Sequence, residues 1–284
     1  MLQNVPMGSI ISMTVTAFVS LLLPIAALIF FRKKTGGRFS AVFIGAGTFI
    51  AFALILETLL HQLVLAAAGQ AAFENIWFYA IYGGLAAGIF EETGRLLSMK
   101  LLMKKTLCKR DSLMFGTGHG GAEAIILGGL TYLSNAAIAL MINSGAMEQT
   151  LSTMDDATRA ITVQQLSALW TSPSYMFLIS ALERIVAFVL QLCLSYIVYR
   201  AVRYKKPLLY ILAVFLHFLM DALIVLIAKF SSVFAAEGVL FVMTACLSVI
   251  AFRAYRSEKE PEPEQTSEPE SIQEAEIILE DKNN

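Results

Sequence analysis

Charged residues and cysteines are both scarce in this sequence of 284 residues. Asp, Glu, Lys and Arg make up 15% of it, whereas hydrophobic residues make up 57%. Soluble globular proteins carry about 25% charged residues, so this composition excludes that class and is typical of polytopic membrane proteins. Cys108, Cys193 and Cys246 are far apart and form no CxxC, which argues against a disulfide framework and a cysteine metal cage.

Signals of other protein classes are also missing. Residues 1–8 contain no basic residue, and the apolar run after them is too long for a signal peptide. We therefore expect this run to stay in place as a first span. No HExxH occurs, so the usual zinc-protease helix is absent. No repeat of fixed period is found, which weakens a transporter built from inverted halves.

Seven apolar runs are long enough to cross a bilayer, which takes about 20 residues. They cover residues 9–31, 39–67, 76–99, 112–142, 173–199, 207–228 and 231–252. The loops after the first, third, fifth and seventh runs are basic, whereas the alternate loops carry only Arg159 and Lys229. By the positive-inside rule, the N-terminus is outside and the C-terminus cytoplasmic. The sequence predicts an all-α bundle of about seven transmembrane helices in a multi-pass protein of a bacterial plasma membrane.

Residues 257–284 differ in composition from residues 1–256, the predicted transmembrane domain. They carry ten acidic residues against two lysines, with three prolines among them. This predicts an acidic, disordered cytoplasmic tail that catalysis does not need. The loop 143–172 contains an amphipathic segment whose pattern suits an interfacial helix on the outer surface, and for the loop we favour a structured connector over a gating lid.

Two glutamates and an arginine lie inside the third run. On insertion scales, placing one ionisable side chain at mid-membrane costs about 2.5–3.5 kcal/mol of free energy. Glu91, Glu92 and Arg95 are therefore expected to have a functional role. On a helix Arg95 shares a face with Glu91, and Gly84 and Gly88 continue that face. Because glycines let another helix come close, we expect Glu91 to face protein or a small water-filled cavity. Arg95 would hold one glutamate in its charged form.

Two histidines extend this constellation. His119 precedes Glu123 by four residues in the fourth run, and His217 precedes Asp221 by four in the sixth. Counted at about 1.5 Å per residue from the cytoplasmic ends, both pairs share a layer with the glutamates. Hydrogen bonding across helices explains any one such residue, but it is a poor explanation for all of them. Four glycines around His119 predict close backbone packing or a bend.

Other polar residues in the runs are expected to be structural. We interpret Glu183 and Arg184, nearer the outside, as an ion pair. Glu57 and His61, near the outer end of the second run, are interpreted as packing or interfacial residues.

Two chemistries fit the site residues. Two neutral imidazoles with one or two carboxylates suit zinc and leave a position for a water whose pKa falls to about 7. The candidate ligands are His119, Glu123, His217 and Asp221. Without a metal, a glutamate and a histidine polarise a water for attack on a carbonyl, while the second histidine stabilises the oxyanion. Neither chemistry needs a nucleophilic serine or cysteine.

Three motifs together resemble the glutamate-dependent intramembrane proteases, which include the CAAX prenyl proteases, bacteriocin-processing enzymes, and the PrsW-like and YhfC-like families. A Glu-Glu pair followed by a basic residue is matched by residues 91–95. An aromatic residue four before a histidine is matched by Phe115 and His119. A histidine four before Asn or Asp is matched by His217 and Asp221.

The run 118–123, Gly-His-Gly-Gly-Ala-Glu, looks most like the YhfC-like family, whose members are often described as metalloproteases. The likeness covers the core of the transmembrane domain, residues 76–228. It implies that Glu91, paired with Glu92, activates a water together with His119.

The resemblance also implies that Arg95 orients the glutamates and that His217 with Asp221 stabilises the oxyanion. The chain departs from the CAAX enzymes in two ways. Two residues, instead of the usual three, separate the Glu-Glu pair from Arg95, and Asp221 stands where those enzymes usually have Asn. A carboxylate is a worse oxyanion donor unless protonated, and a better metal ligand or base.

The sequence thus predicts an intramembrane endopeptidase that hydrolyses a peptide bond in a membrane-associated protein or lipidated peptide. The water is activated by Glu and His with zinc, or without any metal. Membrane lipids are the other expected partners, and the basic loops follow topology and give no reason to expect nucleic-acid binding. A proton- or cation-coupled transporter is the alternative, and a noncatalytic membrane scaffold is third.

Overall fold

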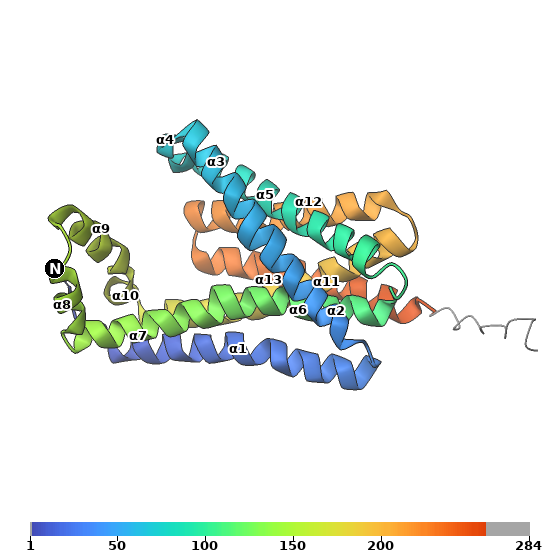
Figure 1. The fold of residues 1–284 in the computed structure, drawn as a ribbon, viewed down its shortest axis with the longest axis horizontal. Coiled ribbons are helices and arrows are strands. Elements are labelled where there is room, and N and C mark those ends of the chain that lie inside the picture. Colours follow the sequence, from blue (N-terminus) through green and yellow to red (C-terminus); the bar gives the residue numbers. More distant parts are fainter. Residues whose placement is uncertain (1, 260–284) are drawn as a thin grey trace, which may run out of the picture.

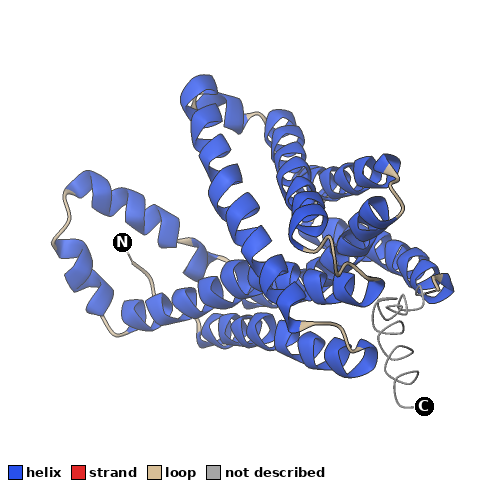
Figure 2. Cartoon of the chain, turned by 45° about the vertical axis from the view of Figure 1, so that its right-hand side comes forward, coloured by secondary structure: helices blue, strands red, loops and turns tan. Residues whose placement is uncertain are grey.

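The computed structural model describes residues 2–259, and every regular element in this part of the chain is a helix (Figure 2). In chain order the elements are α1 (Met7–Thr35), α2 (Phe39–Phe49), η1 (Ile50–Glu57), α3 (Thr58–Ala68), α4 (Gln70–Glu74), α5 (Ile76–Leu97), η2 (Ser98–Leu102), α6 (Lys109–Glu123), η3 (Ala124–Leu130), α7 (Thr131–Asn143), α8 (Ala146–Ser152), α9 (Asp156–Leu166), α10 (Ala168–Thr171), α11 (Ser174–Arg203), α12 (Pro207–Phe230) and α13 (Val233–Ser257). The all-α prediction is confirmed. Most of the predicted acidic tail, residues 260–284, lies outside the described residues.

A long helix lies at each of the seven predicted spans. Within residues 2–259, six helical runs are long and apolar enough to cross a membrane. They are Met7–Thr35, Phe39–Ala68, Lys109–Asn143, Ser174–Arg203, Pro207–Phe230 and Val233–Ser257. The exception is α5, because Glu91, Glu92 and Arg95 lower its apolarity. The multi-pass character is confirmed, and the orientation of the termini stays a prediction.

Local sequence sets where several helices begin and end. The Asn75 side chain accepts hydrogen bonds from the backbone N–H groups of Trp77 and Phe78, which caps the start of α5. Pro207 occupies the first turn of α12, where no backbone donor is needed. Gly36 ends α1 with a φ of 69°, a left-handed conformation that glycine adopts readily.

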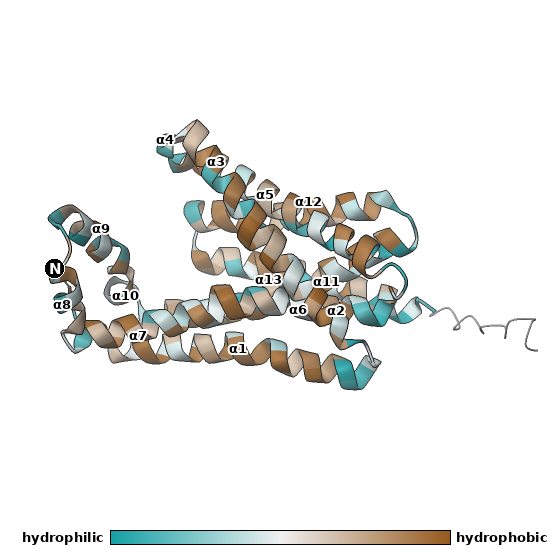
Figure 3. Cartoon of the chain, in the orientation of Figure 1, coloured by the Kyte–Doolittle hydropathy of each residue, from teal (hydrophilic) through white to brown (hydrophobic). Residues whose placement is uncertain are grey.

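Helices distant in sequence pack together around the middle of the bundle. α1 and the run α6–η3–α7 lie side by side along much of their length, and α11 packs against both (Figure 1). α2 packs on α6, α5 packs on α12, and α13 contacts α11 and α12. The outer faces are mostly apolar, as the hydropathy colouring of α1 shows up to its hydrophilic end before α2 (Figure 3). Such faces suit contact with lipid.

Glycines allow the closest helix contacts, as predicted. A Cβ added to Gly84 or Gly88 of α5 would lie 2.7 or 2.8 Å from the Phe218 or Val214 carbonyl oxygen of α12. Gly118 of α6 lies directly against the backbone of Val42 in α2. These contacts draw α2, α5, α6 and α12 together, and they bring the polar residues of these helices into one layer.

Three helical runs contain π-helical stretches, a rare form that frequently occurs at functional sites. Glu57 ends η1, and Glu123 immediately precedes η3. η2 begins at Ser98, three residues after Arg95.

The loop 143–172 is a structured connector made of α8, α9 and α10. Leu151 and Leu169 are buried in an apolar cluster with residues near the N-terminus. Asn143 ties this cluster together because its side chain exchanges two hydrogen bonds with the backbone of Val5, at 2.8 and 2.9 Å. The loop is therefore structured, as predicted.

Candidate active site

The centre of the site is a charged cluster on α5. Glu92 and Arg95 are completely buried, and Glu91 is 7% exposed. The Arg95 guanidinium donates to Glu92 through Nη1 and to Glu91 through Nη2, at 3.3 Å in the second case. The expected i,i+4 contact between Glu91 and Arg95 is therefore present. One arginine facing two carboxylates compensates part of the cost of burying them.

The two histidines reach this cluster from different helices. His119 Nε2 on α6 lies 2.9 Å from Glu91 Oε2, and His217 Nδ1 on α12 lies 2.7 Å from Glu92 Oε1. Both rings are buried. Because an ionised carboxylate only accepts hydrogen bonds, each of these nitrogens carries a proton when it bonds to its glutamate. Three helices thus bring together residues that are distant in sequence.

Aromatic rings fix the orientation of His119. Phe115, one turn earlier on α6, stacks on the imidazole with ring centroids 6.2 Å apart, and Phe49 of α2 meets it edge-on at 5.3 Å. Within the described residues, His119 Nδ1 is buried without a hydrogen-bond partner. The ring is therefore held by packing on its sides and by Glu91 at one nitrogen.

Asp221 lies at the edge of the site and is more exposed than the buried glutamates and histidines. Its Oδ2 lies 3.6 Å from His217 Nε2, and its side chain is 37% exposed. The same His217 nitrogen lies 4.0 Å from Glu91 Oε1. A second ring nitrogen thus faces two carboxylates without bonding to either, since these distances exceed those of hydrogen bonds.

Gln191 of α11 is a site residue that the sequence analysis missed. Its Oε1 accepts from Arg95, and its Nε2 lies 3.3 Å from Glu91 Oε2 and 2.5 Å from Glu123 Oε2. Gly120 makes room for it, because a Cβ there would lie 2.8 Å from the Gln191 Cβ. The sequence signal that could have found it is a single glutamine in the otherwise apolar stretch 185–194.

Glu123 extends the network away from His119. Arg184 Nη1 donates to Glu123 Oε1 at 3.0 Å, and the same guanidinium bonds to Glu183. The predicted pair of Glu183 and Arg184 is therefore confirmed as a contact, with Glu123 as an additional partner. A continuous chain of hydrogen bonds leads from Arg95 through Gln191 to Arg184.

Glu57 also lies beside the site, although it was interpreted as a packing or interfacial residue. It is 8% exposed and lies close enough to Glu91, His217 and Asp221 for electrostatic interaction. His61 Nε2 is 3.3 Å from Glu57 Oε1, and its Nδ1 bonds to the Tyr82 hydroxyl at 2.8 Å. Glu57 thus places a further carboxylate near the site.

Comparison with known proteins places this constellation in a family. The model of the family described as "YhfC intramembrane metalloprotease" matches residues 19–244, which include every predicted site residue. The chain belongs to the YhfC family. It is 36% identical over 244 residues to the "Uncharacterized membrane protein YhfC" of Bacillus subtilis (strain 168), covering 85% of this chain and 94% of that protein. No solved structure matches the chain.

The YhfC family description implies a metal, and the donor types at the site fit one. The separations of His217 Nε2 from Asp221 and Glu91 are close to those of two ligands that share one zinc ion, each about 2.0–2.2 Å from it. Glu92 bonds to the opposite nitrogen of His217, as carboxylates behind metal-bound histidines do. Within residues 2–259, however, no three His, Cys, Asp or Glu side chains already form a metal-holding group. Glu123, one of the predicted ligands, bonds to other residues.

Proposed function

We propose that this chain is an intramembrane endopeptidase that hydrolyses a peptide bond in a membrane-associated protein or lipidated peptide. The observation that carries the proposal is the hydrogen bond between Glu91 and His119, inside a buried charged cluster of a membrane helix bundle. The description of the YhfC family supports it.

In this proposal Glu91 is the general base. Its carboxylate takes a proton from a water, whose oxygen attacks the carbonyl carbon of the substrate. The C–N bond then breaks, and the proton passes to the leaving amine. Arg95 keeps Glu91 ionised and fixed in one rotamer, while His119 holds the same carboxylate from the other side.

His217 is proposed to stabilise the oxyanion. Its Nδ1–H donates to Glu92, so Nε2 is the nitrogen left for the substrate. When the ring is doubly protonated, the Nε2–H donates a hydrogen bond to the developing negative charge. The nearby Asp221 and Glu91 favour this charged form by electrostatic attraction.

The metal form of the proposal uses the same nitrogen, His217 Nε2, in its unprotonated state. A neutral His217 Nε2, with Asp221 and Glu91, would hold a divalent ion such as zinc. When bound, such an ion polarises the carbonyl and lowers the pKa of its water. Elemental analysis of detergent-purified protein separates the two forms of the proposal: about one zinc per chain, lost in His217→Ala, supports the metal form.

The experiment that tests the proposal is a comparison of new protein N-termini in membranes from cells that express wild type or Glu91→Gln. Mass spectrometry should find cleavage sites in membrane-associated proteins with wild type, reduced at least about 100-fold with Glu91→Gln. Glu148→Gln is the matched control, because this exposed glutamate on α8 pairs only with Arg159 in the described residues. Equal cleavage with wild type, Glu91→Gln, His119→Ala and His217→Ala would overturn the proposal.

A coupled transporter is the second candidate, and one observation favours it. The hydrogen-bonded chain from Glu91 through Gln191 to Glu123 and Arg184 resembles the ionisable chains that mark ion pathways in membrane proteins. A pH-dependent solute flux in liposomes, lost in Glu91→Gln, would support this candidate. The absence of such a flux together with specific cleavage would exclude it.

A further inference from the structure

A cavity separate from the charged site opens between α1, α6, α11 and α13. Its volume is about 970 Å³, within the range of ligand pockets, which run from about 300 to 1,000 Å³. Leu113 of α6, Leu192 of α11 and Phe252 of α13 line its apolar walls. We call this cavity the basic groove because of the residues at its rim.

Cations from three elements surround one end of the basic groove. The basic residues that line it are Lys34, Lys109, Arg110, Arg256 and Lys259. Glu258 is the acidic residue among the lining residues, and both its carboxylate oxygens accept hydrogen bonds, from the Tyr196 and Tyr199 hydroxyls at 2.7 and 2.6 Å. The rim therefore carries a net positive charge above an apolar interior.

We propose that the basic groove binds an anionic phospholipid, with the head group at the basic rim and an acyl chain along the apolar walls. The groove borders lipid-facing surface, since Phe30 and Phe252 line it and are 58% and 60% exposed. Basic pockets between transmembrane helices suit anionic head groups, which are enriched in the cytoplasmic leaflet. The predicted topology places the basic ends of α1 and α13 on that side.

The basic groove and the charged site share helix α11. Gln191 points to Glu91, whereas its neighbour Leu192 lines the groove and packs against Gly116 of α6. A lipid in the groove would thus support α6 and α11 from behind, on the side opposite to Gln191. The proposal does not depend on the protease assignment.

The test measures the melting temperature of the full chain in a neutral detergent with added short-chain lipid. Dioctanoyl phosphatidylglycerol should raise it by about 5 °C near saturation, and the zwitterionic dioctanoyl phosphatidylcholine should not. In Lys34→Gln/Arg256→Gln the phosphatidylglycerol affinity should fall about 30-fold. Lys33→Gln/Arg253→Gln is the matched control: it removes the same charge from the same two helix ends, but neither residue lines the groove.

A second variant tests the apolar part without changing charge. Ala251 lines the groove, so Ala251→Phe should obstruct part of it and weaken phosphatidylglycerol binding, while its own melting temperature without lipid reports on folding. Equal shifts with both lipids, equal losses in the two double variants, or the same shift with inorganic phosphate would each overturn the proposal. No shift with either lipid would also overturn it, and would direct attention to an acidic segment such as residues 260–284 as the occupant.

Discussion

At the residue scale, the site is a set of buried charges that satisfy one another. Arg95 bonds to both glutamates and to Gln191, and each glutamate bonds to one histidine. In a membrane such a set is tolerated only when it is nearly complete, because an unpaired buried charge is costly. Removing any one member should therefore cost more stability than the loss of its own hydrogen bonds, because its neighbours then remain as incompletely paired buried charges.

Gln191 provides the clearest residue-scale prediction. Gln191→Leu keeps the side-chain volume similar but removes one hydrogen-bond partner each from Arg95, Glu91 and Glu123, at a cost of about 1–3 kcal/mol for a buried polar group that loses its bond. We expect a lower melting temperature and lower cleavage activity. Gln165→Leu on the exposed face of α9 is the control and should change stability by less than about 0.5 kcal/mol. A Gln191→Leu protein as stable and active as wild type would contradict this role.

Cys108 gives a pH-dependent prediction outside the spans. Burial raises the pKa of its thiol above the ordinary value, and the thiolate is the reactive form. At pH 8 we therefore expect maleimide to modify Cys108 more slowly than an exposed cysteine introduced as Lys105→Cys. The rate at Cys108 should rise as pH increases through its raised pKa. Equal rates at both positions at pH 8 would show that burial does not protect this thiol.

The core of the candidate site could be predicted from sequence because its members repeat one pattern. Each histidine stands one turn from a carboxylate, and linear counting placed them at one depth. Gln191 was missed because no charged residue or histidine lies three or four positions from it on its own helix. The position of Glu57 near the site was not predicted, because counting along the run 39–67 assumes a helix normal to the membrane, whereas α2–η1–α3 runs diagonally across the bundle (Figure 1).

At the element scale, glycine positions determine which helices carry the site together. α5 meets α12 through Gly84 and Gly88, and α6 meets α2 through Gly118. The span boundaries followed from apolar run length alone, as the predicted 9–31 and the observed Met7–Thr35 illustrate. The π-helical stretches could not be predicted in this way, because they depend on packing between helices and the spacing of apolar residues in the sequence does not indicate them.

Two adjacent glycines of α5 allow a matched test of this packing. Gly84→Ala places a Cβ 2.7 Å from the Phe218 carbonyl oxygen, so the helices must separate, at a cost of about 1–3 kcal/mol. Gly83 has nothing within 4 Å, so Gly83→Ala should stabilise the helix by up to about 1 kcal/mol. Thermal unfolding of both variants in one detergent measures the difference. If Gly84→Ala melts at or above Gly83→Ala, the α5–α12 contact does not depend on glycine.

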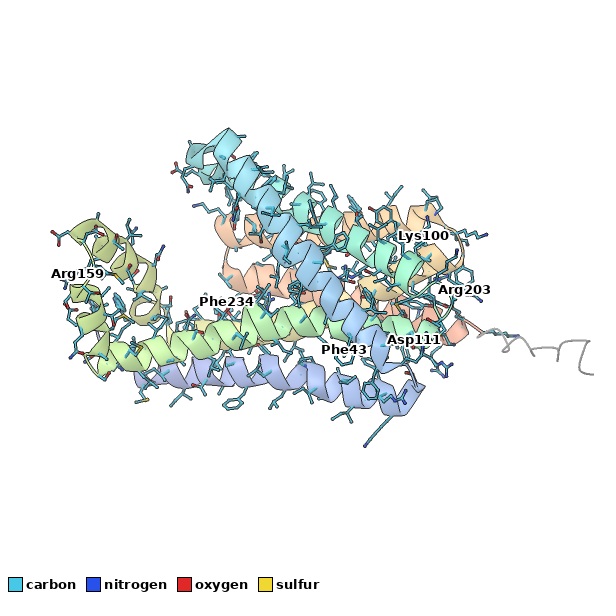
Figure 4. The ribbon with its side chains drawn as sticks, viewed as in Figure 1. Phe43, Lys100, Asp111, Arg159, Arg203 and Phe234 are labelled. Atoms are coloured by element: carbon cyan, nitrogen blue, oxygen red, sulfur yellow. The ribbon has the colours of Figure 1, made fainter. Side chains whose placement is uncertain are left out.

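At the scale of the whole molecule, charge separates the two ends of the bundle. Lys100 and Arg203 lie at one end together with Asp111, and Arg159 lies at the opposite end (Figure 4). Arg38 and Asp111 form an ion pair that joins the starts of α2 and α6 at the first end. The excess of lysine and arginine predicts that this end faces the cytoplasm.

Cysteine labelling tests this orientation. In a Cys108→Ser background, a membrane-impermeant maleimide added to intact cells should label Gln165→Cys on α9 and not Lys105→Cys. Permeabilised cells should show labelling at both positions. The reverse pattern in intact cells would place the basic end outside and contradict the predicted topology.

The central claim is that Glu91 activates a water to hydrolyse a peptide bond. The most direct measurement uses purified protein in proteoliposomes, a substrate identified from the cellular cleavage sites, and water enriched in ¹⁸O. We predict one ¹⁸O atom in each new C-terminal carboxylate with wild type, and at least about 100-fold less labelled product with Glu91→Gln. Undiminished formation of labelled product by Glu91→Gln would contradict the claim.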